Sequence, residues 1–296
     1  TSVSRGLGDV YKRQYQDGYS PQGMYEVLSV LKDQEIYSKQ LAERRGQEPR
    51  SYHGVFASHP SNDKRLQEVL NNVSNSFQKG KQKKNDTYLQ KIEGMVFGDS
   101  EQSGIRRGTE FFHGPLNLYL ASPKTWEIIN TPNQLIFSSP SGEAVLHMTL
   151  EDLNFKETPE EYLKRFAPYT FEDQSLNVNG YDGFTAKVNR SGRLTRMGVI
   201  FKNDQVFQFI GYTKDQRFDL SAYDVQFLQI MKSLRSLKKE EQPLSKPLRL
   251  RSYKVKKGDT YKSLAAISSI NINAEDQLRL INGDYPDKKL ELGRLI

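Results

Sequence analysis

The sequence predicts a multidomain α+β protein, and three observations predict it. Its 296 residues are enough for two or three domains, and 36% of them are apolar, as in ordinary globular cores. Helical spacing of apolar residues near the beginning gives way to short strands separated by turn signals in the middle. A proline-containing linker at 242–247 then sets off a short C-terminal segment.

Composition excludes several classes of function. The chain has no cysteine, which excludes disulfides and thiolate chemistry, and no apolar run is long enough to form a transmembrane helix. The formal net charge is +7, and residues 242–296 carry 11 Lys/Arg against 6 Asp/Glu. A basic surface of this kind can bind an anionic membrane or the acidic polymers of a cell envelope. The simpler interpretation is that these charges lie on a solvated linker and tail. No nucleic-acid-reading motif accompanies the charge, so we expect no nucleic-acid partner.

Residues 1–14 show no targeting pattern, because they lack an apolar central region and a cleavage-like site. They resemble translated sequencing-adapter DNA. We therefore expect them to be an artefact that replaces the natural beginning of the protein.

Two amphipathic helices are predicted in residues 15–80. Ser20 is suited to cap the first, with Pro21 at the first helical position. Its apolar face is Met24, Val27, Leu28 and Leu31. The second helix follows Pro60, and its apolar face is Leu66, Val69, Leu70, Val73 and Phe77. Each stripe needs a partner to bury it.

After a linker at 81–87, residues 88–239 read as a separate α+β domain with an antiparallel sheet. Turns at Asn179-Gly180, Ser191-Gly192 and Asn203-Asp204 separate strands at 184–189, 196–202 and 206–212. Thr158-Pro159-Glu160-Glu161 is a capping box that opens a helix. A closing helix carries Tyr223, Phe227, Ile230 and Leu234 on one side. We expect an α/β/α sandwich.

The loop and helix at 54–66, with His59-Pro60 and Arg65, follow a helix opened by the segment 17–24. This pair resembles the C-terminal part of the HtpX-like and CAAX-prenyl-protease-like zinc metallopeptidases of the gluzincin clan. The resemblance implies that residues 15–80 are a helical remnant of a peptidase domain. It implies that the zinc-binding HExxH helix, the third ligand and the catalytic glutamate precede residue 1. Those catalytic helices would be the partners of the two stripes, so this piece alone should be poorly ordered or exposed.

A zinc peptidase needs two histidines on one helix face, and the four histidines here do not supply them. We therefore expect no catalytic residue and no bound zinc in this fragment, although the intact parent would hold zinc. The resemblance makes His59 a gate over the metal cleft or an extra ligand; alternatively it braces the turn. Arg65 is either a carboxylate partner or a solvated residue. His113 and His147 are interpreted as ordinary surface or strand residues.

The middle domain is similar to the PsbP-like sandwich, on the basis of the segment 117–126, the capped helix at 158–167 and the segment 227–234. After a linker at 240–251, residues 252–296 resemble a LysM module, with the order strand, helix, helix, strand. The resemblance rests on the segments 253–265, 280–283 and 290–296. If it extends to binding, the residues that border a glycan groove are Gly258, Asp259, Thr260 and Asn282; alternatively they are turn and cap residues.

By its resemblance to the zinc metallopeptidases, the sequence predicts a fragment of a periplasmic zinc metalloendopeptidase, inactive alone, that acts in envelope protein quality control on protein or peptide substrates. The alternative is a non-enzymatic protein that binds peptidoglycan or another envelope component through its LysM-like tail. A role for the middle domain in contacting outer-membrane assembly proteins is a third hypothesis.

Overall fold

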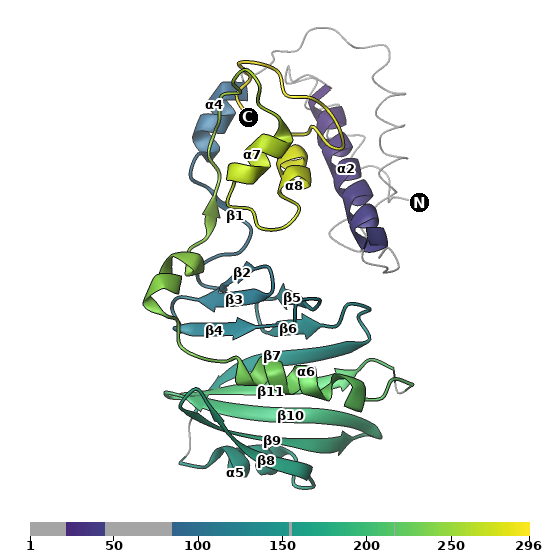
Figure 1. Cartoon of the computed structure of the whole chain (residues 1–296), viewed down its shortest axis with the longest axis vertical. Helices are drawn as coiled ribbons and strands as arrows, with labels where there is room; N and C mark the ends of the chain where they lie inside the picture. Colours follow the sequence, from purple (N-terminus) through teal and green to yellow (C-terminus); the bar gives the residue numbers. More distant parts are fainter. Residues whose placement is uncertain (1–21, 45–84, 154–155, 216) are drawn as a thin grey trace, which may run out of the picture. The chain divides into compact units, whose positions relative to one another are not determined.

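The computed structural model describes residues 22–44, 85–153, 156–215 and 217–296 (Figure 1). The chain divides into two compact units. One is Val96–Arg249, and the other combines Thr1–Met95 with Leu250–Ile296. The helix predicted after Pro60 and the Ser20 cap lie outside the described residues.

A seven-stranded antiparallel sheet forms the body of the unit Val96–Arg249 (Figure 1). Its strand order is β5-β6-β7-β11-β10-β9-β8. The strands are β5 Glu127–Asn130, β6 Leu135–Ser138, β7 Ala144–Asp152, β8 Phe171–Val178, β9 Tyr181–Arg190, β10 Arg193–Lys202 and β11 Gln205–Thr213. The predicted α+β class with a large antiparallel sheet is therefore confirmed.

Tight turns set the register of the last four strands. Asn179 and Gly180, with φ of 53° and 89°, join β8 to β9, and Ser191 and Gly192, with φ of 53° and 78°, join β9 to β10. Two successive positive φ angles define the type I′ turn, whose twist matches that of the flanking strands. The third turn has Asn203 at φ 56° and joins β10 to β11. All three turns are where the sequence predicts them.

Helix α6 (Ser221–Lys232) packs on one face of this sheet (Figure 1). Phe227 lies over Gly211 and Met231 over Gly198, where a side chain would leave no room for the helix. The buried residues on this side include Phe207, Phe209, Phe227 and Ile230. The apolar face predicted for the closing helix is thus confirmed at Phe227 and Ile230.

Helix α5 (Pro159–Phe166) packs on the opposite face of the sheet. Side chains alternate along a strand, so Met197 and Val199 of β10 face α5 while Gly198 between them faces α6. The predicted capping box is confirmed: Thr158 Oγ1 accepts from the Glu161 N–H at 3.2 Å, and Glu161 Oε2 accepts from the Thr158 N–H at 2.7 Å. Tyr162 and Leu163 form a second core with residues of β9 and β10. This helix covers only part of the face, and the part near the β9–β10 turn stays open.

A smaller antiparallel sheet has the strand order β2-β3-β4. A two-stranded antiparallel sheet, β1-β12, pairs the first residues of the unit with its last. The strands are β2 Ile105–Arg107, β3 Glu110–His113, β4 Leu118–Ala121, β1 Val96–Phe97 and β12 Leu248–Arg249, and a 3-10 helix, η1, spans Lys239–Ser245. Lys202 is 1% exposed and donates to the Leu116 carbonyl at 2.9 Å. This bond ties the end of β10 to the loop before β4.

The other unit holds four described helices, α2 Gln22–Arg44, α4 Asn85–Ile92, α7 Tyr261–Ile267 and α8 Ala274–Ile281 (Figure 1). Helix α2 contacts α8 and the loop after it. Leu28 is 1% exposed, and Gln40 Oε1 accepts from the Tyr285 hydroxyl at 2.5 Å. The sequence predicts that this helix alone is poorly ordered or exposed; instead Leu28 is buried and C-terminal residues contact the helix, whereas Val27 is 57% exposed.

Candidate functional sites

The C-terminal segment folds back on itself around two short helices. An antiparallel bridge pairs Lys254 with Leu295, and Tyr253 and Ile296 exchange two backbone hydrogen bonds of 2.8 and 2.9 Å. Between these ends the chain forms α7 and then α8. An isolated bridge thus joins the two segments that flank these helices.

The predicted residues Gly258, Asp259 and Thr260 form the turn before α7. Gly258 has φ of 91°, a conformation that other residues rarely adopt. Asp259 Oδ2 accepts from the Lys256 N–H at 2.7 Å, and Thr260 Oγ1 accepts from the Ser263 N–H at 3.0 Å. Their side chains thus make turn and cap contacts in this structure.

The fourth predicted residue, Asn282, ends α8. Its side-chain amide donates to the Leu278 carbonyl at 2.8 Å, and its own carbonyl accepts from Arg294 at 3.1 Å. Arg294 also donates to Asp284 at 2.6 Å. Asn282 is therefore held next to a buried carboxylate.

Asp284 is the centre of this module, and its side chain is fully buried. Oδ2 accepts from the Tyr261 hydroxyl at 2.5 Å, and Lys288 Nζ lies 3.3 Å from Oδ1 without forming a hydrogen bond. Burial and the bond to Asp284 raise the pKa of Tyr261 above its ordinary value. Through Tyr261 and Arg294, one carboxylate joins the turn at Thr260 to the end of α8. Asp284 was not predicted from the sequence, because its position after Asn282-Gly283 has the pattern of an ordinary turn.

His59 and Arg65 lie outside the described residues. His113 and His147 lie in β3 and β7, as interpreted from the sequence. Burial lowers the pKa of both imidazoles, and the charge of Lys214 lowers that of His147 further. Among the described residues, no group of three or more Asp, Glu and His side chains could hold a metal ion.

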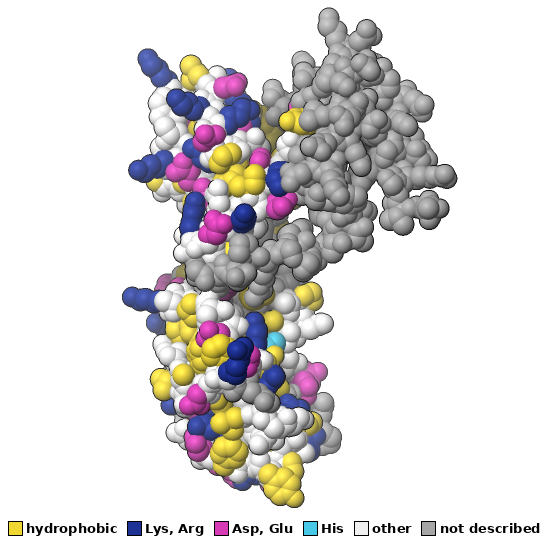
Figure 2. Space-filling model, turned by 90° about the vertical axis from the view of Figure 1, so that its right-hand side faces the viewer, with side chains coloured by type: hydrophobic (Ala, Val, Ile, Leu, Met, Phe, Trp, Pro, Cys, Tyr) yellow, Lys and Arg dark blue, Asp and Glu magenta, His cyan; other side chains and the backbone are white. Residues whose placement is uncertain are grey.

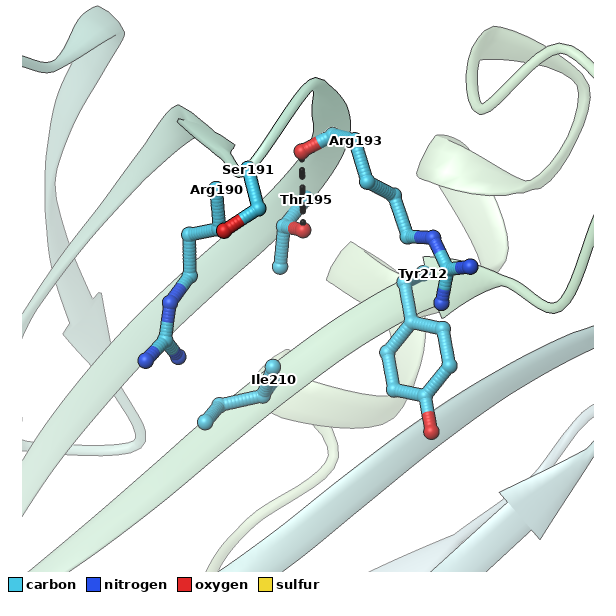
Figure 3. Close-up of a pocket in the computed structure, with 6 residues that line it drawn as sticks. All are labelled: Arg190, Ser191, Arg193, Thr195, Ile210 and Tyr212. Atoms are coloured by element: carbon cyan, nitrogen blue, oxygen red, sulfur yellow. Dashed lines mark hydrogen bonds between the residues drawn. The ribbon is translucent and has the colours of Figure 1, made fainter. Parts of the chain in front are cut away.

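A pocket of about 320 Å³ opens on the part of the large sheet that α5 leaves uncovered. It is lined by Arg190, Ser191, Arg193, Thr195, Ile210 and Tyr212 (Figure 3). This site was not predicted from the sequence. The available signal was the pair of arginines that flank the Ser191-Gly192 turn, because a two-residue turn places its flanking residues directly opposite each other.

His147 supports the aromatic wall of the pocket. Its ring stacks on that of Tyr212, with centroids 5.5 Å apart and planes 9° apart. The Tyr212 hydroxyl lies 3.2 Å from His147 Nε2, and His147 Nδ1 lies 2.9 Å from Gln134 Oε1. The Nδ1–H tautomer satisfies both bonds: Tyr212 donates to Nε2, and Nδ1–H donates to Gln134. Since its pKa is lowered, the imidazole is uncharged at neutral pH.

Charge alone marks no site on the face shown in Figure 2. Lys and Arg side chains lie there among Asp and Glu side chains. None of the helices in the described part of the chain is long and apolar enough to cross a membrane.

No protein-family model and no curated protein matches the chain. Among solved structures, cyanobacterial PsbP (CyanoP) from Synechocystis sp. PCC 6803 is 10% identical, with a TM-score of 0.35, and the match covers 46% of this chain and 94% of that one. LpqN of Mycobacterium tuberculosis, described as involved in cell envelope biogenesis, is 13% identical, with a TM-score of 0.29 and coverage of 52% and 98%. A protein of unknown function from Pseudomonas aeruginosa is 18% identical, with a TM-score of 0.28 and coverage of 40% and 92%.

These comparisons correct the resemblance to zinc metallopeptidases, which is wrong. No peptidase family model and no curated peptidase matches the chain. The zinc chemistry that the resemblance implied for His59 and for a missing HExxH helix therefore loses its basis.

Proposed function

We propose that the chain is a non-enzymatic binding protein of the bacterial cell envelope, located in the periplasm, whose residues 252–296 dock on peptidoglycan. In this proposal residues 252–296 are a LysM-like βααβ module, and residues 88–239 are a PsbP-like α/β/α sandwich. The observation that carries the proposal is the closure of the C-terminal segment. Lys254 pairs with Leu295, with α7 and α8 between them.

The charge of the module also supports an acidic polymer as its ligand. Residues 242–296 carry 11 Lys/Arg against 6 Asp/Glu. Lys256 and Lys257 are exposed next to the Gly258 turn. Peptidoglycan carries carboxylates on its peptide stems, which such lysines attract at low salt.

The test is sedimentation of the full chain with purified insoluble peptidoglycan. We expect retention in the pellet at low salt. A double variant, Lys256→Gln with Lys257→Gln, should be retained several-fold less. Lys124→Gln with Lys156→Gln is the matched control, because it removes the same charge from exposed positions of the sandwich. Wild-type protein that stays in the supernatant, or equal loss in both double variants, would contradict docking through this module.

A further inference from the structure

Two arginines occupy opposed backbone positions at the tip of the β9–β10 hairpin, and their guanidinium groups lie on opposite sides of the pocket (Figure 3). Arg190 and Arg193 are direct cross-strand partners, flanking the Ser191-Gly192 turn. Like charges in directly opposed positions destabilise a sheet, so an anion bound in the pocket beside them would be favoured.

Nothing in the described part of the chain neutralises this pair. Arg190 makes no ion pair there, and Arg193 Nη2 reaches only the Lys214 carbonyl, at 3.5 Å. The nearby carboxylate is Asp215, whose pKa is lowered mainly by Arg217 and least by Arg193. Arg217 donates to Asp215 Oδ2 through two bonds of 2.9 and 2.7 Å, so this carboxylate is already occupied.

Below the arginines the pocket is apolar and aromatic. The Ile210 side chain and the Tyr212 ring form its floor and one wall (Figure 3). The Arg193 guanidinium lies 5.5 Å from the centre of the Tyr212 ring. The stacked His147 fixes the ring in place, so the wall is formed before any ligand arrives.

We propose that this pocket binds a small organic carboxylate with a flat apolar body. The carboxylate pairs with the Arg193 guanidinium, Arg190 on the opposite side of the pocket adds a second positive charge, and the flat body lies against Tyr212 and Ile210 (Figure 3). Arginine suits this role because its planar fork matches a carboxylate with two parallel hydrogen bonds. The volume of about 320 Å³ accommodates one small molecule of this kind. This site is separate from the C-terminal module, so its test is independent of peptidoglycan docking.

The experiment measures binding of indole-3-acetate to the full chain by calorimetry and by ligand-observed NMR. Indole-3-acetamide has the same flat body without the charge, and inorganic phosphate has the charge without the flat body. We expect indole-3-acetate to bind, with affinity that falls as salt rises, and both other probes to bind about tenfold more weakly or less. Equal binding of the acid and the amide, or equal binding of phosphate, would overturn the proposed ligand class.

Variants locate the binding on the pocket. Arg190→Met and Arg193→Met should each weaken indole-3-acetate binding about tenfold. Lys124→Met, which removes an exposed cation elsewhere on the sandwich, should bind like wild type. Indole-3-acetate binding unchanged by both arginine variants would overturn the site.

A stability measurement separates binding from folding. Because Arg190→Met relieves the opposed charges, we expect the free variant to melt about 1 to 3 °C above wild type. A variant that is more stable yet binds less assigns Arg190 to the ligand. A variant that melts below wild type would give Arg190 a structural role and overturn the proposal.

Discussion

Arg196 on β10 and Asp224 on α6 form a bidentate ion pair between the large sheet and the helix that covers it. Nε lies 2.7 Å from Oδ1, and Nη2 lies 2.6 Å from Oδ2. The side chains are only 4% and 14% exposed. Lys187 Nζ lies 3.6 Å from the same carboxylate, which therefore balances two cations at a mostly buried position.

Removing the charge of Asp224 should strongly destabilise this unit. In Asp224→Asn, Arg196 and Lys187 remain buried, and the carboxylate that still pairs with them is Glu172. Glu172 Oε2 lies 2.6 Å from Lys187 Nζ and 3.6 Å from Arg196 Nη2, but its side chain is 58% exposed, so water weakens its compensation of the two positive charges. We expect the free energy of unfolding to fall by about 3 to 5 kcal/mol. Trp126, the single tryptophan of the sequence, reports the change by fluorescence in urea, because its ring lies 5.8 Å from Phe227 of α6.

Asp182→Asn is the control for this prediction. Asp182 is exposed, and its substitution should change the free energy of unfolding by no more than about 0.5 kcal/mol. If both variants unfold at the same urea concentration as wild type, the ion pair contributes nothing to stability.

The close approach of α6 to the sheet depends on two glycines, which should differ in their tolerance of alanine. A Cβ at Gly211 would lie 2.7 Å from the Phe227 ring, and one at Gly198 would lie 2.6 Å from Met231 Sδ. A flexible thioether moves aside more easily than a packed ring. We expect Gly211→Ala to cost about 1 to 3 kcal/mol and Gly198→Ala clearly less, both measured by urea unfolding. If Gly198→Ala lowered the free energy of unfolding more than Gly211→Ala, the flexibility of Met231 would not decide the cost, and this prediction would be wrong.

Local signals in the sequence identified the parts of the fold that local chemistry determines. Asn179-Gly180 and Ser191-Gly192 predict their turns because few other residues adopt positive φ in succession. Thr158 and Glu161 predict the start of α5 because they satisfy free N–H groups at a helix end. The strands β5 and β8 carry no comparable signal, and the sequence analysis did not identify them.

The candidate sites depend on contacts between distant residues, which a single sequence does not reveal. His147 and Tyr212 are stacked although they are 65 positions apart, and Tyr261 bonds to Asp284 across 23 positions. The register of β7 beside β11 brings the first pair together, and the packing of α7 on α8 brings the second. Gly258, Asp259 and Thr260 were placed correctly before a helix because a turn and a cap are local features.

The Arg235–Glu241 pair should make the stability of the sandwich depend on pH. Its two bonds are both 2.7 Å, and they are the largest cause that lowers the pKa of Glu241 from 4.5 to about 2. Since the folded-state pKa is the lower one, this contribution is fully present above pH 4.5 and is lost as the pH falls toward 2. Glu241→Gln should be less stable than wild type at neutral pH, and the difference should narrow across that window. Urea unfolding of both proteins at several pH values tests this, and a constant difference would contradict it.

Tyr261→Phe should loosen the C-terminal module while leaving the large sheet unchanged. The substitution removes a donor from the fully buried Asp284, which then keeps Arg294 as its hydrogen-bond donor. A lost hydrogen bond to a buried charge costs about 1.5 to 3 kcal/mol, so amide exchange in α7 and α8 should become about tenfold to a hundredfold faster. Hydrogen exchange read by mass spectrometry resolves these helices from the strands of the sandwich.

Tyr253→Phe is the matched control, because it also removes a hydroxyl that donates to a carboxylate, that of Asp259 at 2.9 Å. Asp259 is partly exposed and keeps its bond from the Lys256 N–H, so water and the backbone compensate for the loss. Exchange in α7 and α8 should therefore change much less than in Tyr261→Phe. If amide exchange accelerated equally in the two variants, the Tyr261–Asp284 hydrogen bond would contribute no more to stability than the exposed Tyr253–Asp259 bond. The stability of the module would then come from its apolar contacts.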